Sequence, residues 1–306
     1  MHLSFLRLEL YSAMMLSVLI VKFNGRRVFV KGAEGSFVSG VFERLEKRLV
    51  SDIIIRMEKE MNVGHMHPIS RAILEIHEIF EELGFVVAVG PELETEWYNF
   101  DALNIPKDHP ARDMQDTFWL KEPKSVVESL KLKVKSDKRL LRTHTSPVQI
   151  RYMEEKLKAG IKPPYKIIVP GKVFRNEATD ATHEAQFFQL EALYVDKNVS
   201  MAHLKGVLEF FFKRFFGPKV EIRFRPSFFS FTEPSAEVDM KWKGKWLEMV
   251  GSGLVHPNVL KAVGLDPKAY SGFAFGCGID RLVMLKYGIP DIRMFYNGDL
   301  RLVNQF

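Results

Sequence analysis

Two polar side chains, Gln189 and Glu191, are two positions apart in the otherwise mostly apolar stretch Gln186–Val195. Because side chains on a strand alternate between its two faces, Phe187, Gln189 and Glu191 share one face, while apolar residues at even-numbered positions share the other. Burying an amide or a carboxylate without a partner costs about 1–3 kcal/mol. The alternation therefore predicts that Gln189 and Glu191 meet polar partners or a ligand.

Two further segments add groups of the same kind. As a strand, residues 172–177 would place Arg175 and Glu177 on one face, and Phe229 and Phe231 would likewise share a face. If these segments are neighbours in one sheet, a single face carries an arginine, carboxylates, an amide and three aromatic rings. That set suits a ligand with an anionic, a cationic and a planar apolar part. A solvated sheet face with ion pairs explains the alternation equally well, so both interpretations stay open at this point.

Short strands and separate blocks of helix must position these side chains. Periodicity and turn residues predict strands at residues 85–89, 165–169, 172–177, 186–195, 220–226, 230–240 and 246–250. They predict a helix capped by Ser70 and ended by Gly84, and others from Ser146–Pro147 to Gly160, from Ser200 to Phe216 and from Gly278 to Tyr287. This order favours an α+β fold with an antiparallel sheet over a doubly wound parallel sheet. Arg281, after a glycine-rich turn, is on its own more typical of a solvated charge.

The first sixty residues have a different pattern. Asn24-Gly25 separates the short runs Leu16–Phe23 and Arg27–Val30, which predicts a hairpin. Apolar residues at three-to-four spacing predict an amphipathic helix over Val41–Met61. We therefore divide the chain into a segment of residues 1–62 and a domain of residues 63–306.

Composition restricts the classes of protein that fit. The chain has 306 residues, of which 46% are hydrophobic, and a net charge of +6, which permits an anionic partner without requiring one. The single cysteine, Cys277, allows no internal disulfide and favours a reducing compartment. The longest apolar run, Ala13–Val21, is less than half of the roughly 20 residues that span a bilayer, so we expect a cytoplasmic protein without a membrane segment.

Several common catalytic signatures are missing from the sequence. No GxxxxGK[ST] segment is present, and the single cysteine leaves no cysteine cluster for zinc. His183-Glu184 begins like a zinc-protease motif but lacks its second histidine, and His65 and His67 have no third ligand nearby. A nucleotide-binding enzyme with this sequence must use something other than the usual phosphate loop.

Longer motifs resemble a known family. Phe174-Arg175-Asn176-Glu177 with the following 179–184 segment resembles motif 2 of class II aminoacyl-tRNA synthetases, and residues 276–281 resemble motif 3. Residues 107–118, 141–149, 272–276 and 287–306 make the resemblance specific to the bacterial phenylalanyl-tRNA synthetase alpha-subunit family. It extends from about His65 to the last residue. The resemblance implies a class II synthetase-like antiparallel sheet flanked by helices, behind a short divergent N-terminal segment.

The resemblance also implies the reaction and the residues that bind ATP. Phenylalanine would be activated with ATP to phenylalanyl-adenylate and then transferred to tRNA(Phe). Arg175 would bridge the substrate carboxylate and the α-phosphate, and Arg281 would hold the far phosphates. Phe187 would stack on adenine, with Glu177 at its edge and His183 also in the ATP site. Glu248 would be a Mg²⁺ ligand.

The remaining implied residues surround phenylalanine. The residues expected around the substrate ammonium are His144, Ser146, Gln149, Gln189 and Glu191. Phe229 and Phe231 would pack edge-on against the phenyl ring, and Ala274 would form the floor of the pocket. The implied partners are a beta subunit, with two alpha and two beta chains in the assembly, and tRNA(Phe).

The sequence departs from the family pattern at a few places. Phe188, Ala192 and Ser230 replace other residues at positions expected on the sheet face away from the site. Motif 3 has Asp280 before Arg281 where the family has glutamate, one methylene longer. Of the long helical hairpin of the family, only Val41–Met61 fits part of one arm, and residues 1–40 do not resemble it. Two alternatives therefore stay open: a non-catalytic paralogue that binds tRNA or a partner, and an amino-acid adenylating enzyme with another acceptor.

Overall fold

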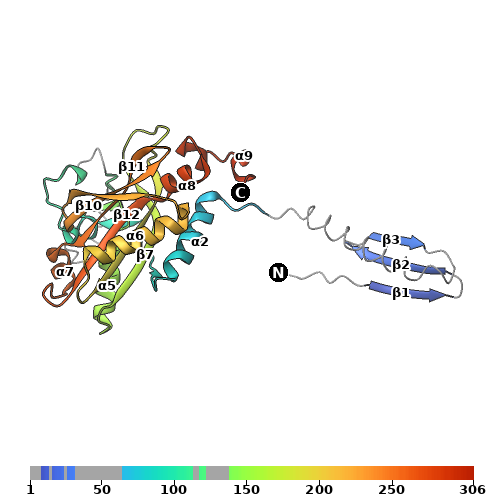
Figure 1. Ribbon diagram of the computed structural model, residues 1–306, viewed down its shortest axis with the longest axis horizontal. Coiled ribbons are helices and arrows are strands. Elements are labelled where there is room, and N and C mark those ends of the chain that lie inside the picture. The colour runs from blue at the N-terminus through green and yellow to red at the C-terminus, as the bar shows by residue number, and fades with distance from the viewer. Residues whose placement is uncertain (1–7, 14–15, 24–25, 32–63, 113–116, 122–137) are drawn as a thin grey trace. The chain divides into compact units, whose positions relative to one another are not determined.

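The computed structural model describes residues 8–13, 16–23, 26–31, 64–112, 117–121 and 138–306, and the chain divides into two compact units, residues 1–64 and 65–306. In the first unit, β1 (Leu8–Ala13), β2 (Leu16–Phe23) and β3 (Arg26–Lys31) form an antiparallel sheet in chain order (Figure 1). The β2–β3 pair confirms the predicted hairpin. The helix predicted over residues 41–61 lies outside the described residues.

A seven-stranded sheet organises the second unit. Its spatial order is β4 (Val86–Val87), β7 (Tyr165–Phe174), β8 (Gln186–Asp196), β12 (Ser271–Gly278), β11 (Lys245–Val255), β10 (Thr232–Trp242) and β9 (Ile222–Phe229). Every neighbouring pair is antiparallel except β4–β7. A two-stranded sheet of β5 (Leu93–Thr95) and β6 (Arg139–Leu141) lies apart from it. The predicted α+β class is confirmed, with one parallel pair in a mainly antiparallel sheet.

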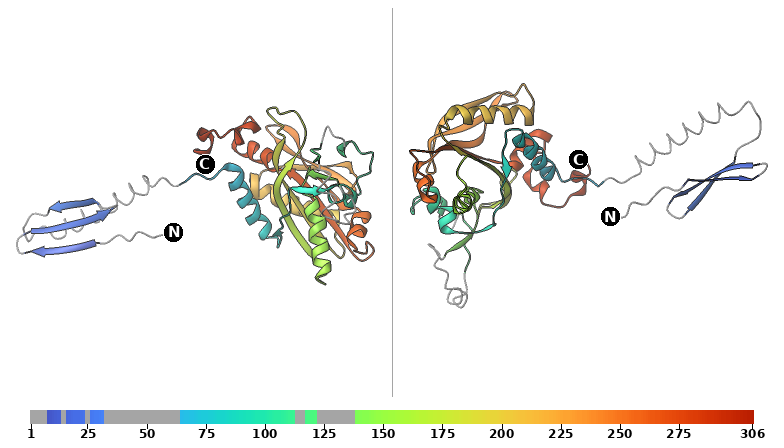
Figure 2. Two further views of the ribbon diagram at one scale, coloured as in Figure 1. Left: turned by 180° about the vertical axis from the view of Figure 1, so that it is seen from behind. Right: turned by 90° about the horizontal axis from the view of Figure 1, so that it is seen from below.

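Helices cover both faces of this sheet (Figures 1 and 2). On one face, α2 (Pro68–Glu81), α6 (Met201–Phe216) and α8 (Ile279–Tyr287) pack against even-numbered β8 residues such as Leu190 and Ala192. On the other, α5 (Pro147–Lys158) and α7 (Pro257–Val263) pack with Leu193 and Val195. The period of two along β8 thus separates two hydrophobic cores. The short elements are α3 (Glu96–Asn99), η1 (Asp101–Leu103), η2 (Pro110–Arg112), η3 (Ile292–Phe295) and α9 (Leu300–Val303).

The four helices predicted within residues 64–306 are present, with one change of cap. Helix α2 begins at Pro68 because His67 Nδ1 accepts a hydrogen bond from the Ile69 N–H, so Ser70 is inside the helix and does not cap it. Pro147 occupies the first position of α5, as predicted. Gly217 follows the end of α6, also as predicted. No helix among the described residues has the length and apolarity needed to cross a membrane.

Several strand predictions were wrong in their bounds, and one strand was missed; β11, for example, extends to Val255, five residues past its predicted end. Residues 165–174 form one continuous strand that ends at Phe174, so Glu177 lies beyond it. The strand predicted over residues 85–89 has only two residues, both with exposed side chains. Strand β12 was not predicted, because its three glycines lower strand propensity; Gly276–Gly278 is therefore a strand end and not a turn.

Ile76 and Leu74 lie on opposite faces of α2 and offer a matched test of the core. Ile76 is fully buried, whereas Leu74 is half exposed. We predict that Ile76→Ala lowers the free energy of unfolding by about 2–5 kcal/mol, through lost burial and a cavity. Leu74→Ala should change it by less than about 1 kcal/mol. Chemical denaturation measures both values, and equal losses would contradict the assigned orientation of α2.

Candidate active site

A cavity of about 460 Å³ opens on the sheet face that carries α5 and α7. Its volume lies within the range of about 300–1,000 Å³ typical of small-molecule sites. Most of the residues predicted for the site line it: His144, Ser146, Gln149, Arg175, Gln189, Glu191, Phe229, Phe231, Glu248 and Ala274. Strand β8, the turn between β9 and β10, strands β11 and β12, and the start of α5 bring them together.

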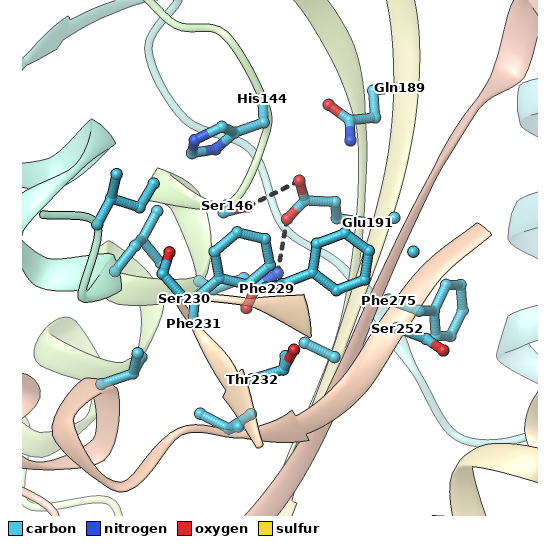
Figure 3. Close-up of a pocket in the computed structure, with 18 of the residues that line it drawn as sticks. His144, Ser146, Gln189, Glu191, Phe229, Ser230, Phe231, Thr232, Ser252 and Phe275 are labelled. Atoms are coloured by element: carbon cyan, nitrogen blue, oxygen red, sulfur yellow. Dashed lines mark hydrogen bonds between the residues drawn. The ribbon is translucent and has the colours of Figure 1, made fainter. Parts of the chain in front are cut away.

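The Glu191 carboxylate is buried at the polar end of the cavity (Figure 3). Oε1 accepts a hydrogen bond of 2.8 Å from Ser146 Oγ, and Oε2 accepts one of 2.7 Å from Gln149 Nε2. Both donors come from the N-terminal end of α5, where Ser146 precedes Pro147. The sequence prediction that Glu191 needs polar partners is confirmed.

Burial controls the charge of Glu191. It raises the pKa of the carboxyl to about 7, although the hydrogen bonds from Ser146 and Gln149 and the positive charge of Arg142 act in the opposite direction. The group is therefore poised between its neutral and charged forms near neutral pH. A cation that enters the pocket would favour the charged form.

His144 and Gln189 carry buried polar atoms that no other described residue satisfies. Oε1 of Gln189 lacks a hydrogen-bond partner within the described part of the chain, and neither ring nitrogen of His144 has one of ordinary geometry, although the nearby Asn99 backbone acts to raise the pKa of His144. Burial, together with the positive charge of Arg175, lowers the pKa of His144 to about 3. The imidazole is therefore neutral, and one of its nitrogens can accept a hydrogen bond. Figure 3 shows both side chains beside Glu191. Unsatisfied acceptors next to a carboxylate fit a ligand that donates several hydrogen bonds.

The opposite end of the cavity is apolar. The Phe229 and Phe231 rings lie 5.8 Å apart between centroids and 16° from parallel (Figure 3). Ala274 and Val259 extend this wall. Strand β9, which bears Phe229, is not a neighbour of β7 or β8, so the condition stated for a shared face is not met by direct pairing; β12, β11 and β10 lie between β8 and β9.

Glycines in the central strands leave room for the aromatic rings and for the polar side chains of the cavity. A Cβ on Gly251 would lie 2.9 Å from Cζ of Phe229, so the ring reaches over β11 only because that position has no side chain. A Cβ on its register partner Gly276 would lie 3.0 Å from Gln189 Nε2 and 3.2 Å from Glu191 Cγ. Sequence reasoning did not identify Gly251 or Gly276 as part of the site, since it did not include the strand pairing.

The departures from the family pattern fall on both sides of the sheet. Ala192 is buried in the hydrophobic core on the sheet face that carries α2, α6 and α8, and Phe188 packs against this core, as expected. Ser230 was predicted on that same face and lines the cavity instead. The reason is that residues 230–231 form a tight turn, in which strand alternation does not hold. The Ser230 carbonyl accepts a hydrogen bond of 2.6 Å from Asn104 Nδ2.

Arg175 lies at the edge of the cavity, directly after β7. Its backbone N–H donates to the Ala185 carbonyl and extends the β7–β8 pairing by one bond. The guanidinium carbon lies 5.0 Å from the centre of the Phe187 ring, so the two side chains are stacked. Arg175 is the residue predicted to bind an anion, and Phe187 is the residue predicted to stack on a planar ring.

Four predicted residues do not line the cavity. Phe187 lies beside it under Arg175, while Glu177 and His183 are exposed in the connection between β7 and β8. Arg281 is exposed in the first turn of α8. These four residues lie outside the cavity, so only a ligand that extended from the cavity past Arg175 could reach them.

Glu248 is the one candidate metal ligand among the predicted residues. Its side chain is 60% exposed at the cavity wall, and its nearest ion-pair partner is Arg225 at 3.9 Å. The described residues contain no group of three or more His, Cys, Asp or Glu side chains placed to hold a metal. One carboxylate together with substrate phosphates is a common way for proteins to hold Mg²⁺, so Glu248 fits that role only alongside a bound nucleotide.

Comparisons with known proteins agree with this geometry. Residues 51–306 match the model of a family described as the class II core domain (F) of tRNA synthetases. The chain is 53% identical over 243 residues to the phenylalanine–tRNA ligase alpha subunit of Synechocystis, covering 79% of this chain and 67% of that protein. It is 54% identical over 255 residues to the alpha subunit from Shouchella clausii, covering 79% and 69%.

One solved structure resembles the fold. The pyrrolysyl-tRNA synthetase from Desulfitobacterium hafniense superposes with a TM-score of 0.59 over 87% of each chain, at 18% identity. At that identity the likeness concerns the fold alone.

The raised pKa of Glu191 predicts a pH-dependent stability. The folded state holds the proton up to about pH 7, whereas the unfolded chain releases it near 4.5. The folded state therefore binds this proton more tightly than the unfolded chain does. The stabilisation that results is complete below pH 4.5 and is lost as the pH rises through 7. Relative to Glu191→Gln, the free energy of unfolding of the native chain should fall by up to about 3 kcal/mol between pH 4.5 and 8. Denaturant titrations of both proteins test this, and a pH-independent difference would contradict it.

Proposed function

The chain belongs to the family of phenylalanine–tRNA ligase alpha subunits within the class II aminoacyl-tRNA synthetases, and we propose that its cavity is where L-phenylalanine is activated. The reaction of the family forms phenylalanyl-adenylate from phenylalanine and ATP, and then transfers the acyl group to tRNA(Phe). One observation carries the assignment to this cavity: two phenylalanine rings line the same cavity as a buried carboxylate, with unsatisfied acceptors beside it.

Phenylalanine matches this cavity in both size and polarity. Its ammonium would pair with Glu191 and donate hydrogen bonds to Gln189 and His144. Ser146 and Gln149 hold the Glu191 carboxylate in place. Its ring would pack against Phe229 and Phe231 over Ala274. A small alanine leaves room there for a phenyl group, and an apolar wall leaves the hydroxyl of tyrosine unsatisfied.

ATP would bind at the Arg175 end of the cavity. Arg175 would contact both the substrate carboxylate and the α-phosphate, because a planar guanidinium donates to two oxyanions at once. The adenine would replace the Arg175 guanidinium on the Phe187 ring, with Glu177 and His183 supplied by the β7–β8 connection. The far phosphates would be held by Arg281 at the start of α8.

The chemical step needs no general base. The phenylalanine carboxylate is already ionised, so its oxygen attacks the α-phosphorus, and the bond from that phosphorus to the bridging oxygen breaks to release pyrophosphate. Positioning by Arg175 and neutralisation of charge on the α-phosphate provide the catalysis. Mg²⁺, if held by Glu248 and the phosphates, would supply further charge neutralisation on ATP.

The alpha-subunit relatives imply partners for this chain. We propose that it assembles with a beta subunit, as two alpha and two beta chains, and that the complex acts on tRNA(Phe) in the cytoplasm. Residues 63–306 would be the catalytic domain. Residues 1–62 would be a divergent segment, either a remnant or a replacement of the helical hairpin that other members use for tRNA.

Arg175→Ala tests the proposed chemistry. In the chain co-expressed with a bacterial-type beta subunit, we predict that it lowers phenylalanine-dependent ATP–pyrophosphate exchange by about 10²-fold or more, since it removes the charge at the α-phosphate. Arg214→Ala is the control, because Arg214 is on α6 and forms an exposed ion pair with Glu82, the C-cap of α2, outside the cavity.

Three results would contradict the proposal. Exchange retained in Arg175→Ala would exclude the assigned role. No exchange by the native complex would favour a non-catalytic paralogue, and exchange without charging of tRNA(Phe) would favour another acceptor.

A further inference from the structure

Asp280 is a buried carboxylate that lies outside the cavity. Its Oδ2 accepts a hydrogen bond of 2.7 Å from the Phe188 backbone N–H, and its Oδ1 accepts one from the Tyr296 hydroxyl. Asp280 is the second residue of α8, Phe188 is in β8, and Tyr296 directly follows η3. One side chain therefore joins three elements.

The bond to Phe188 continues the pairing of β8 and β12 beyond its last residue pair. Strand β12 ends at Gly278, where it pairs with Gln189 of β8. Asp280 then accepts the N–H of Phe188, the next residue along β8. The carboxylate thus fixes the spacing between the helix that carries Arg281 and the strand that carries Phe187.

Tyr296 supplies the second bond that a buried Asp280 carboxylate requires. Burial raises the pKa of Asp280 to about 6, and the hydrogen bonds from Tyr296 and Phe188 counteract that rise. Burial also raises the pKa of Tyr296, so its hydroxyl keeps its proton and acts as the donor. Without that donor, Oδ1 of a buried side chain would lose its partner, which is costly.

The segment around Tyr296 has two further anchors. The Ile292 N–H donates to the Ala181 carbonyl at 3.0 Å, in the connection that bears Glu177 and His183. His67 Nε2 lies 3.0 Å from the Phe295 carbonyl, which ties the segment to the cap of α2. The C-terminal segment is therefore bonded both to the start of α8 and to the β7–β8 connection.

We propose that Tyr296 is a positioning residue for ATP. Through Asp280 it sets Arg281 and Phe187 at the separation that the nucleotide requires, and it does not touch the substrate. Because Asp280 is one methylene shorter than the glutamate of the family pattern, the tyrosine donor holds the shorter side chain in place. This inference rests on the proposed function, since Arg281 and Phe187 matter only if ATP binds there.

The test compares Tyr296→Phe, Asp280→Asn and the double variant in the full complex with the beta subunit. Direct titration with ATP should show binding weakened about five- to tenfold in Tyr296→Phe, the effect of losing one hydrogen bond of ordinary strength. The KM for ATP in pyrophosphate exchange should rise equally, while the KM for phenylalanine stays within about twofold. If Tyr296 acts through Asp280, the double variant should bind ATP no more weakly than Asp280→Asn alone.

Tyr287→Phe is the matched control, since Tyr287 is at the far end of α8 and packs on Phe306. It should leave both KM values unchanged. Unaltered ATP binding in Tyr296→Phe would overturn the inference, as would equal losses for ATP and phenylalanine or additive effects in the double variant. Absence of exchange in the native complex would instead contradict the proposed function, because ATP binding is measured separately.

Discussion

The hydrogen bonds from Ser146 and Gln149 to the buried Glu191 carboxylate are the interaction on which the site depends. A carboxylate on a central strand is expensive to bury, and its high pKa expresses that cost. The start of α5 and the middle of β8 must therefore stay together for the pocket to exist. The result is a preformed place for a cation at the polar end of the cavity.

The sheet provides the second constraint, which is space. Gly251 and Gly276 are register partners in adjacent strands, and each lacks a side chain where a pocket residue passes. The aromatic rings from the β9–β10 turn can therefore lie on the same side as Glu191, four strands away in the sheet. The arrangement explains how one mainly antiparallel sheet brings apolar rings and a carboxylate into a single cavity of about 460 Å³.

Some of this site could be predicted from sequence and some could not. Strand period alone placed Gln189 and Glu191 on one face and Ala192 on the other, because β8 is long and regular. The same rule was wrong for Ser230, which is in a turn, and for Glu177, which lies past the end of β7. The glycine-rich strand β12 and the Asp280–Tyr296 contact arise from tertiary pairing, which local pattern does not record.

The most direct test of the central claim is calorimetric titration of the complex with L-phenylalanine near pH 6.5, in buffers that differ in ionisation enthalpy. If the substrate ammonium pairs with Glu191, binding lowers the pKa of that carboxyl from about 7 and releases part of a proton. The pKa of His144, about 3, and that of Cys277, about 12, lie outside this range. The release should disappear above pH 8 and in Glu191→Gln. Binding without proton release by the native complex, or an unchanged release in the variant, would contradict the assignment.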